Sequence, residues 1–137
     1  MSKIVWVNGS FDVVHLNHLE LLKFAKSLGD KLVVGIDSDN RVMNFKGAGR
    51  PINKAKERAA FLKHISNYVD EVWVFATDEQ LEDTIRLVNP DIMVVGVEYK
   101  NKRIIGKELV KEVVFFEEPR ITSSTEIIEK AELKKPL

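Results

Sequence analysis

The sequence predicts an α/β fold centred on a five-stranded parallel sheet. Two observations lead to this class. Several short runs are apolar at nearly every position, which is typical of strands buried on both faces of a sheet. Segments with apolar residues three or four positions apart, typical of helices, separate these runs. We therefore expect a Rossmann-like, doubly wound sheet with helices on both faces, in one domain covering residues 1–137.

The expected strands are short and apolar, and the clearest of them reads Leu-Val-Val-Gly-Ile at its centre. The carboxyl ends of parallel strands share one edge of a sheet, and ligands collect beyond that edge. Residues that follow the strands are therefore expected to converge there, although they lie far apart in the sequence. The five expected strands are Lys3–Val7, Lys31–Ile36, Val72–Phe75, Ile92–Gly96 and Val113–Phe116.

Residue types that favour helix termini bound the expected helices. Asn53 is a candidate N-cap, and Thr77 with Gln80 and Ser123 with Glu126 have the spacing of capping boxes. Asn and Gly residues followed by polar or proline residues mark the ends of the first and third helices. The four expected helices cover His18–Leu28, Ala55–Ile65, the residues from Thr77 through Val88, and the residues from Ser123 through Ala131.

The composition excludes several classes of protein. Lys plus Arg and Asp plus Glu both number 21, and this balance argues against nucleic-acid binding through a broad basic surface. The absence of cysteine excludes disulfides, thiolate chemistry and cysteine-based metal sites. No apolar stretch approaches the length of a membrane span. We therefore expect a cytoplasmic protein whose partners are neither nucleic acid nor membrane.

The segment after the first strand is the strongest functional signal. Gly9 and Ser10 form a turn of small residues, and His15 and His18 follow at the start of the first helix. Such turns present unpaired backbone N–H groups that attract anions, and Gly9 can adopt a positive φ there. One histidine packed in the core and one at a helix end is the alternative interpretation. The pair beside Gly-Ser favours a polyphosphate site, where both imidazoles donate to phosphate oxygens.

The segment from Phe45 to Ile52 is rich in small residues and is expected to be a flexible loop. Its two cations, Lys46 and Arg50, can close over an anionic substrate, although a solvated linker explains the same composition equally well. On the helix that follows, Arg58 can reach the pocket or pair with a carboxylate, and both interpretations stay open.

Two further segments have a structural and a functional interpretation. Ser123 to Thr125 open the last expected helix, where hydroxyls and free amides suit phosphate, but helix capping alone explains Ser123. Asp37 and Asp39 follow a strand and can contact a ribose or a metal; turn formation is the favoured role.

Taken together, these segments resemble the cytidylyltransferase-like nucleotidyltransferases. That family carries a G-x-F-D turn, an H-x-G-H signature and a late S-[ST]-T motif, and the resemblance covers nearly the whole chain in the family's order. The matching segments are Gly9-Ser10-Phe11-Asp12, His15-Leu16-Asn17-His18, Lys46-Gly47, Arg58 and Ser123-Ser124-Thr125.

Two branches of the family share these motifs. The heptose-phosphate adenylyltransferases (the ADP-heptose synthase type) are favoured by Arg50-Pro51-Ile52-Asn53, Pro90-Asp91-Ile92, Gly96 with Tyr99, and Ile105-Gly106. The glycerol-3-phosphate cytidylyltransferases are the alternative. Their end-motif has an arginine, two residues and a glycine before I-S-T-T, a spacing that Arg120 does not fit.

The resemblance implies that a phosphorylated sugar or polyol attacks the α-phosphorus of a nucleoside triphosphate, ATP being favoured, and that pyrophosphate leaves. It also implies Mg²⁺ as the cofactor and a homodimer, and no metal ligand among the side chains. The implied catalytic residues are His15, His18 and Lys46. The implied nucleotide-binding residues are Gly9, Ser10, Phe11, Asn17, Gly96, Ser123, Ser124 and Thr125. The implied substrate-binding residues are Asp12, Arg50, Arg58, Glu98 and Tyr99.

The chain departs from the family pattern at Asn17, where H-x-G-H has glycine. A side chain there can crowd the base or ribose, which would change nucleotide choice, slow turnover or leave a nucleotide-binding module without catalysis. A milder interpretation makes Asn17 the N-cap of a helix starting at His18, with Glu20 three residues on. Glu98 also replaces the aspartate that the adenylyltransferase branch tends to have.

Overall fold

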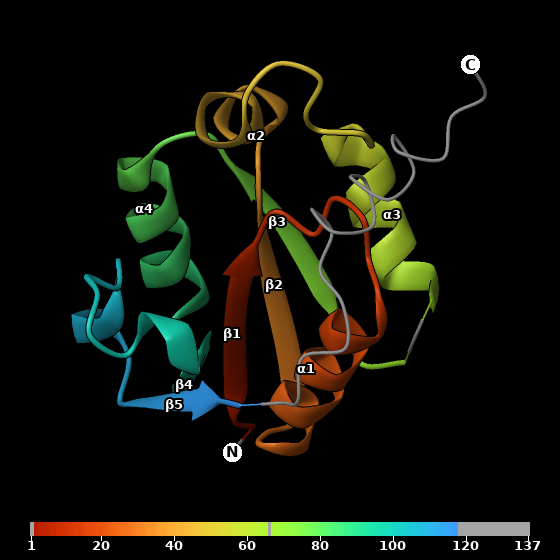
Figure 1. The fold of residues 1–137 in the computed structure, drawn as a ribbon. Helices are drawn as coiled ribbons and strands as arrows, with labels where there is room; N and C mark the ends of the chain where they lie inside the picture. Colours follow the sequence, from red (N-terminus) through yellow and green to blue (C-terminus); the bar gives the residue numbers. More distant parts are fainter. Residues whose placement is uncertain (1, 66, 118–137) are drawn as a thin grey trace.

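The computed structural model describes residues 2–65 and 67–117. Five parallel strands form a single sheet in the order β3-β2-β1-β4-β5 (Figure 1), which confirms the predicted fold class. The observed strands start and end within two residues of the expected ones, because the apolar runs that predicted them supply the buried core. Their bounds are β1 (Ile4–Gly9), β2 (Lys31–Asp37), β3 (Glu71–Phe75), β4 (Ile92–Gly96) and β5 (Glu112–Phe116).

Helices cover both faces of the sheet, as predicted (Figure 1). On one face, α1 (Leu16–Ser27) and α3 (Ala55–Ile65) bury Leu22 and Leu62 against alternate side chains of β1 and β2. On the other face, α4 (Asp78–Val88) and the short 3₁₀ helix η2 (Lys107–Leu109) pack on the second half of the core, and the 3₁₀ helix η1 (Val97–Tyr99) follows β4. No helix within residues 2–65 and 67–117 has the length and apolarity needed to cross a membrane.

One helix was not expected from the sequence. α2 (Asp39–Lys46) begins after Ser38, whose Oγ accepts a hydrogen bond from the Arg41 N–H at 3.2 Å, and it ends at Gly47 with φ 92°. The prediction of a flexible loop from Phe45 onward was therefore wrong at Phe45 and Lys46. α2 buries only Val42, so it carries no apolar stripe for a sequence pattern to detect.

The helix starts also differ from two of the predicted caps. α1 begins at Leu16 with His15 as its N-cap, so the interpretation of Asn17 as the cap was wrong. The first N–H of α3, that of Ala55, donates to Asp39 Oδ1 at 2.8 Å, so the carboxylate of a distant residue replaces the Asn53 cap. The Thr77 cap of α4 is confirmed, with its Oγ1 accepting from the Gln80 N–H at 3.0 Å. The helix expected from Ser123 lies outside the described residues.

The strand order creates a topological switch point. The chain winds outward in one direction through β2 and β3 and in the other through β4 and β5, so the direction reverses between β1 and β4. β1 pairs with β2 from Ile4 to Gly9, whereas its ladder with β4 is limited to Val5–Ile92 and Trp6–Met93. Toward their carboxyl ends β1 and β4 are therefore not joined, and such a switch point is where open α/β sheets bind ligands.

Candidate active site

The turn after β1 owes its shape to Phe11. This residue has φ 50°, whereas Gly9 does not use the positive φ that is open to a glycine. The Phe11 side chain is 3% exposed, and a Cβ on Gly9 would lie 3.2 Å from its Cε2 atom. Burying the aromatic ring offsets the backbone strain at Phe11. Gly9 therefore makes room for this ring, and Phe11 packs in the core rather than exposing its ring for base binding.

The two histidines meet at the first turn of α1. Their rings are stacked, with centroids 4.1 Å apart, and the Phe11 ring lies 5.2 Å from that of His18. The His15 backbone N–H donates to His18 Nδ1 at 3.1 Å. Because this donor fixes Nδ1 as an acceptor, the proton of neutral His18 is carried by Nε2.

The electrostatic surroundings keep His18 neutral. Burial, then the charge of His15 and then that of Lys46 lower the pKa of His18 to about 4. At pH 7 its Nε2–H is therefore a hydrogen-bond donor that carries no positive charge.

Lys46 joins this cluster from the end of α2. Its Nζ donates to Ser10 Oγ at 3.3 Å, which brings the last turn of α2 to the carboxyl end of β1. Burial and then the charge of Arg50 lower the pKa of Lys46. The structure thus brings together Ser10, His15, His18 and Lys46, as the sequence predicted for a phosphate site.

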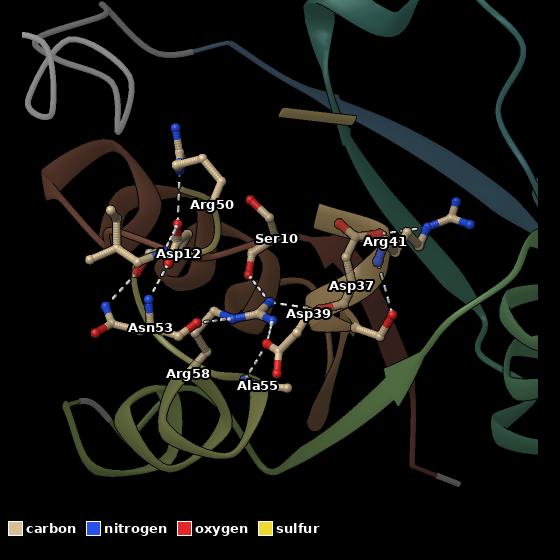
Figure 2. A network of polar contacts seen from close by, with 11 residues as sticks. Ser10, Asp12, Asp37, Asp39, Arg41, Arg50, Asn53, Ala55 and Arg58 are labelled. Carbon is tan, nitrogen blue, oxygen red and sulfur yellow. Dashed lines mark hydrogen bonds and ion pairs between the residues drawn. The ribbon is translucent and has the colours of Figure 1, made fainter. Parts of the chain in front are cut away.

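Arg58 joins the carboxyl ends of β1 and β2 (Figure 2). It is 1% exposed and makes four hydrogen bonds. Its Nη1 donates to the carbonyls of Ser10 at 2.8 Å and Asp37 at 2.7 Å. Nε donates to the Asn53 carbonyl, and Nη2 pairs with Asp39 Oδ1 at 2.9 Å. Of the two interpretations left open, carboxylate pairing is the one observed, so Arg58 is a positioning residue.

Asp12 fixes the segment from Arg50 to Asn53 (Figure 2). Its carboxylate is 0% exposed and accepts from the N–H groups of Ile52 and Asn53, both at 2.8 Å. The same carboxylate pairs with Arg50 Nε at 3.1 Å, and the Asp12 carbonyl accepts from Asn53 Nδ2. These contacts give Asp12 a positioning role.

The acidic residues at and after the end of β2, Asp37 and Asp39, are bound by arginine side chains. Asp37 Oδ1 accepts from Arg41 Nε at 2.8 Å, and burial raises the pKa of Asp37 while this bond to Arg41 opposes the shift. Asp39 lies in the first turn of α2 and joins it to Arg58 and α3. Both residues therefore anchor α2. Sequence reasoning missed Arg41 altogether, and only its spacing of four residues from Asp37 signals the pair.

The remaining predicted residues among those described lie at the end of β4 and on η1. Gly96 ends β4, and a Cβ there would lie 2.5 Å from Glu98 Oε1, so the glycine leaves space for the Glu98 side chain. Tyr99 is 47% exposed, with Lys102 Nζ 5.3 Å from its ring centroid. Glu98 and Tyr99 both lie on η1, which follows Gly96. Ser123, Ser124 and Thr125 lie outside the described residues.

The geometry defines an α/β protein in which imidazole and ammonium groups lie together near the switch point of its sheet. Protein-family comparison agrees with this description. The chain belongs to the cytidylyltransferase-like family, whose model matches residues 6–130.

Similar proteins and a similar solved structure are consistent with this family. The bifunctional protein HldE of Helicobacter pylori is 46% identical over 129 residues, which are 94% of this chain and 27% of that protein. HldE of Helicobacter hepaticus is 42% identical over 134 residues, 98% of this chain. The chain thus spans less than a third of the length of these relatives. A crystal structure of the lipopolysaccharide core biosynthesis protein from Thermoplasma volcanium is similar with a TM-score of 0.72 and 28% identity, over 87% of this chain and 100% of that one.

Proposed function

We propose that the protein transfers a nucleotidyl group from ATP to a sugar phosphate such as heptose 1-phosphate and releases pyrophosphate. The observation that supports this proposal is the cluster of His15, His18 and Lys46 after the carboxyl end of β1. The choice of branch is supported by the segment from Arg50 to Asn53, which Asp12 holds at the site, and by the similarity to HldE proteins.

The reaction needs charge stabilisation more than proton transfer. An acceptor phosphate oxygen forms a bond to the α-phosphorus of the triphosphate. The bond from that phosphorus to the bridging oxygen breaks, and pyrophosphate leaves with the electron pair. Negative charge grows on the transferring group and on the leaving group, and catalysis of this kind comes from positioning and electrostatics.

The cluster supplies donors suited to that charge. The Nε2–H of neutral His18 strengthens its hydrogen bond to a phosphoryl oxygen as charge builds, without giving up its proton. His15, stacked against it, contributes the second imidazole, and the Lys46 ammonium neutralises phosphate charge. The Arg58 and Asp12 contacts hold the backbone on which these groups depend.

Mg²⁺ and a homodimer are further parts of the proposal. In the described ranges no three His, Cys, Asp or Glu side chains form a group that could hold a metal ion. The carboxylates of Asp12 and Asp37 are engaged by Arg50 and Arg41. Mg²⁺ commonly binds through substrate phosphates, so the triphosphate would carry it and the ion would neutralise phosphate charge. Sedimentation equilibrium tests the dimer.

Two other candidates follow from particular residues. CTP with glycerol 3-phosphate is the alternative substrate pair, because that branch shares the pattern from Asp30 to Asp39. A nucleotide-binding protein without turnover is the alternative of another class, because Asn17 replaces the motif glycine. Asn17 lies inside the first turn of α1 between the two histidines, and its presence there has no capping explanation.

Pyrophosphate release separates these candidates. Each of ATP, CTP, GTP and UTP would be mixed with a panel of sugar and polyol phosphates and Mg²⁺, with His18→Ala as the inactive control. We expect release with ATP and a sugar 1-phosphate. Release with CTP and glycerol 3-phosphate would favour the other branch, and ATP binding without product from any pair would overturn the enzymatic proposal.

A further inference from the structure

Arg50 places a buried cationic nitrogen at the site that no described residue satisfies. The Arg50 side chain is 11% exposed, and its Nε donates to Asp12 Oδ2 at 3.1 Å. Its Nη2 is buried, and within residues 2–65 and 67–117 no group accepts a hydrogen bond from it. A buried guanidinium N–H without an acceptor raises the free energy of the folded protein. We therefore expect Nη2 to bind an acceptor that does not belong to the described residues.

The guanidinium is held in place before any ligand binds. The Asp12 carboxylate that accepts from Arg50 also accepts from the N–H groups of Ile52 and Asn53. These bonds fix the backbone just after Arg50 as well as its side chain, and Figure 2 shows Arg50, Asp12 and Asn53 joined in this way. Preorganisation of this kind reduces the entropy lost on binding and is typical of a ligand-binding arginine.

A second cation approaches the same place. Lys46 Nζ donates to Ser10 Oγ at 3.3 Å, and the charge of Arg50 contributes to the lowered pKa of Lys46. The charges of Asp12 and Asp37 oppose this shift of the Lys46 pKa, although Asp12 is engaged by Arg50 Nε and two backbone N–H groups and Asp37 by Arg41. Lys46 and Arg50 thus bind residues two positions apart in the turn after β1, and two positive charges placed there attract an anion that can accept from both.

We propose that Arg50 Nη2 and Lys46 Nζ together hold one phosphate group of a substrate, with Asp12 as the residue that positions Arg50. A phosphate group matches the planar fork of arginine and the point charge of lysine. This inference rests on the proposed function for the identity of the substrates, because either the triphosphate or the acceptor sugar phosphate supplies such a group. Arg50 is then a specificity-determining residue, since its loss weakens whichever substrate it holds.

Arg50→Lys is the informative variant, because it keeps the positive charge but cannot place a nitrogen at Nη2. Arg86→Lys is the matched control, on the exposed face of α4 and paired there with Glu82 and Asp83. ATP, a sugar 1-phosphate and inorganic phosphate would each be titrated alone into the full chain, with affinity measured by calorimetry. We expect Arg50→Lys to weaken inorganic phosphate and one of the two substrates roughly tenfold or more.

The substrate that is weakened identifies the source of the phosphate group. Loss in the ATP titration assigns Arg50 to the triphosphate, and loss in the sugar phosphate titration assigns it to the acceptor. Unchanged affinity for all three probes would overturn the inference. If Arg50→Lys does not fold, Arg50→Gln, which keeps a donor toward Asp12, takes its place. Because these titrations need no turnover, they stand apart from the pyrophosphate assay, whose failure would overturn only the proposed function.

Discussion

Replacing Arg58 should destabilise the whole carboxyl edge of the sheet. Arg58→Met keeps an unbranched side chain of similar length and removes the guanidinium. The three carbonyls that accept from it belong to Ser10, Asp37 and Asn53, so the ends of β1 and β2 lose the group that joins them. The carboxylate of Asp39 loses its cationic partner at the same time and keeps the hydrogen bond from the Ala55 N–H.

The magnitude follows from these contacts. A buried carbonyl left without a donor costs roughly 1–3 kcal/mol, and breaking a buried ion pair by removing one partner costs about 3–5 kcal/mol. These costs overlap, because the loosened turn can relax and Asp39 is 37% exposed, so we expect a loss of about 3–5 kcal/mol in the free energy of unfolding. Domains of this size are stable by roughly 5–15 kcal/mol, so the variant should fold but melt well below the parent protein.

Urea unfolding followed by circular dichroism measures this difference. Arg86→Met removes an arginine that is 55% exposed on α4, and it serves as the control, with an expected change within about 0.5 kcal/mol. Arg58→Lys should fall between the parent and Arg58→Met, because one ammonium cannot reach all four acceptors. If Arg58→Met and Arg86→Met unfold within about 1 kcal/mol of each other, the buried network does not hold the site as described.

Three further predictions concern the first turn of α1. His15→Ala and His18→Ala should each lower kcat by roughly 10²–10³ while changing ATP affinity little, and equal losses in both quantities would mean that the imidazoles only bind. Because the folded pKa of His18 is about 4, below its ordinary value of 6.5, the stabilisation from keeping it neutral is complete above pH 6.5 and is lost as the pH falls toward 4. Unfolding curves between pH 7 and 4 should therefore show a steeper loss in the parent than in His18→Gln; parallel curves would contradict the buried neutral state. Asn17→Gly should raise activity or widen the choice of triphosphate in a substrate panel, and a fall in melting temperature alone would contradict the crowding interpretation.

The sheet and most of its helices could be predicted because their signals are local. Apolar runs identify buried strands, and Thr77 caps α4 through a residue three positions away. α2 escaped this reasoning because it is short and buries only Val42, so it shows no helical stripe. Its start at Ser38 and its end at Gly47 were signals that a cap-based search could have used.

The site was predictable as a set of residues but not as a set of roles. His15 and His18 are near neighbours in sequence, so their meeting follows from helix geometry. Arg58 acts through bonds to residues 19, 21 and 48 positions away, and no periodicity reveals such pairs. The positive φ of Phe11 likewise depends on burial of its ring in a core that forms only with the fold.

The central claim is nucleotidyl transfer at the cluster of His15, His18 and Lys46, and the fate of the α-phosphorus of ATP tests it most directly. The protein would be incubated with heptose 1-phosphate and Mg²⁺ and with ATP radiolabelled at either the α- or the γ-phosphorus. We predict that the α-label appears in a nucleoside diphosphate sugar and the γ-label in pyrophosphate, and that His18→Ala slows the appearance of both by roughly 10²–10³. Transfer of the γ-label to the sugar, or ATP binding with no label transferred to any acceptor in the panel, would contradict this account.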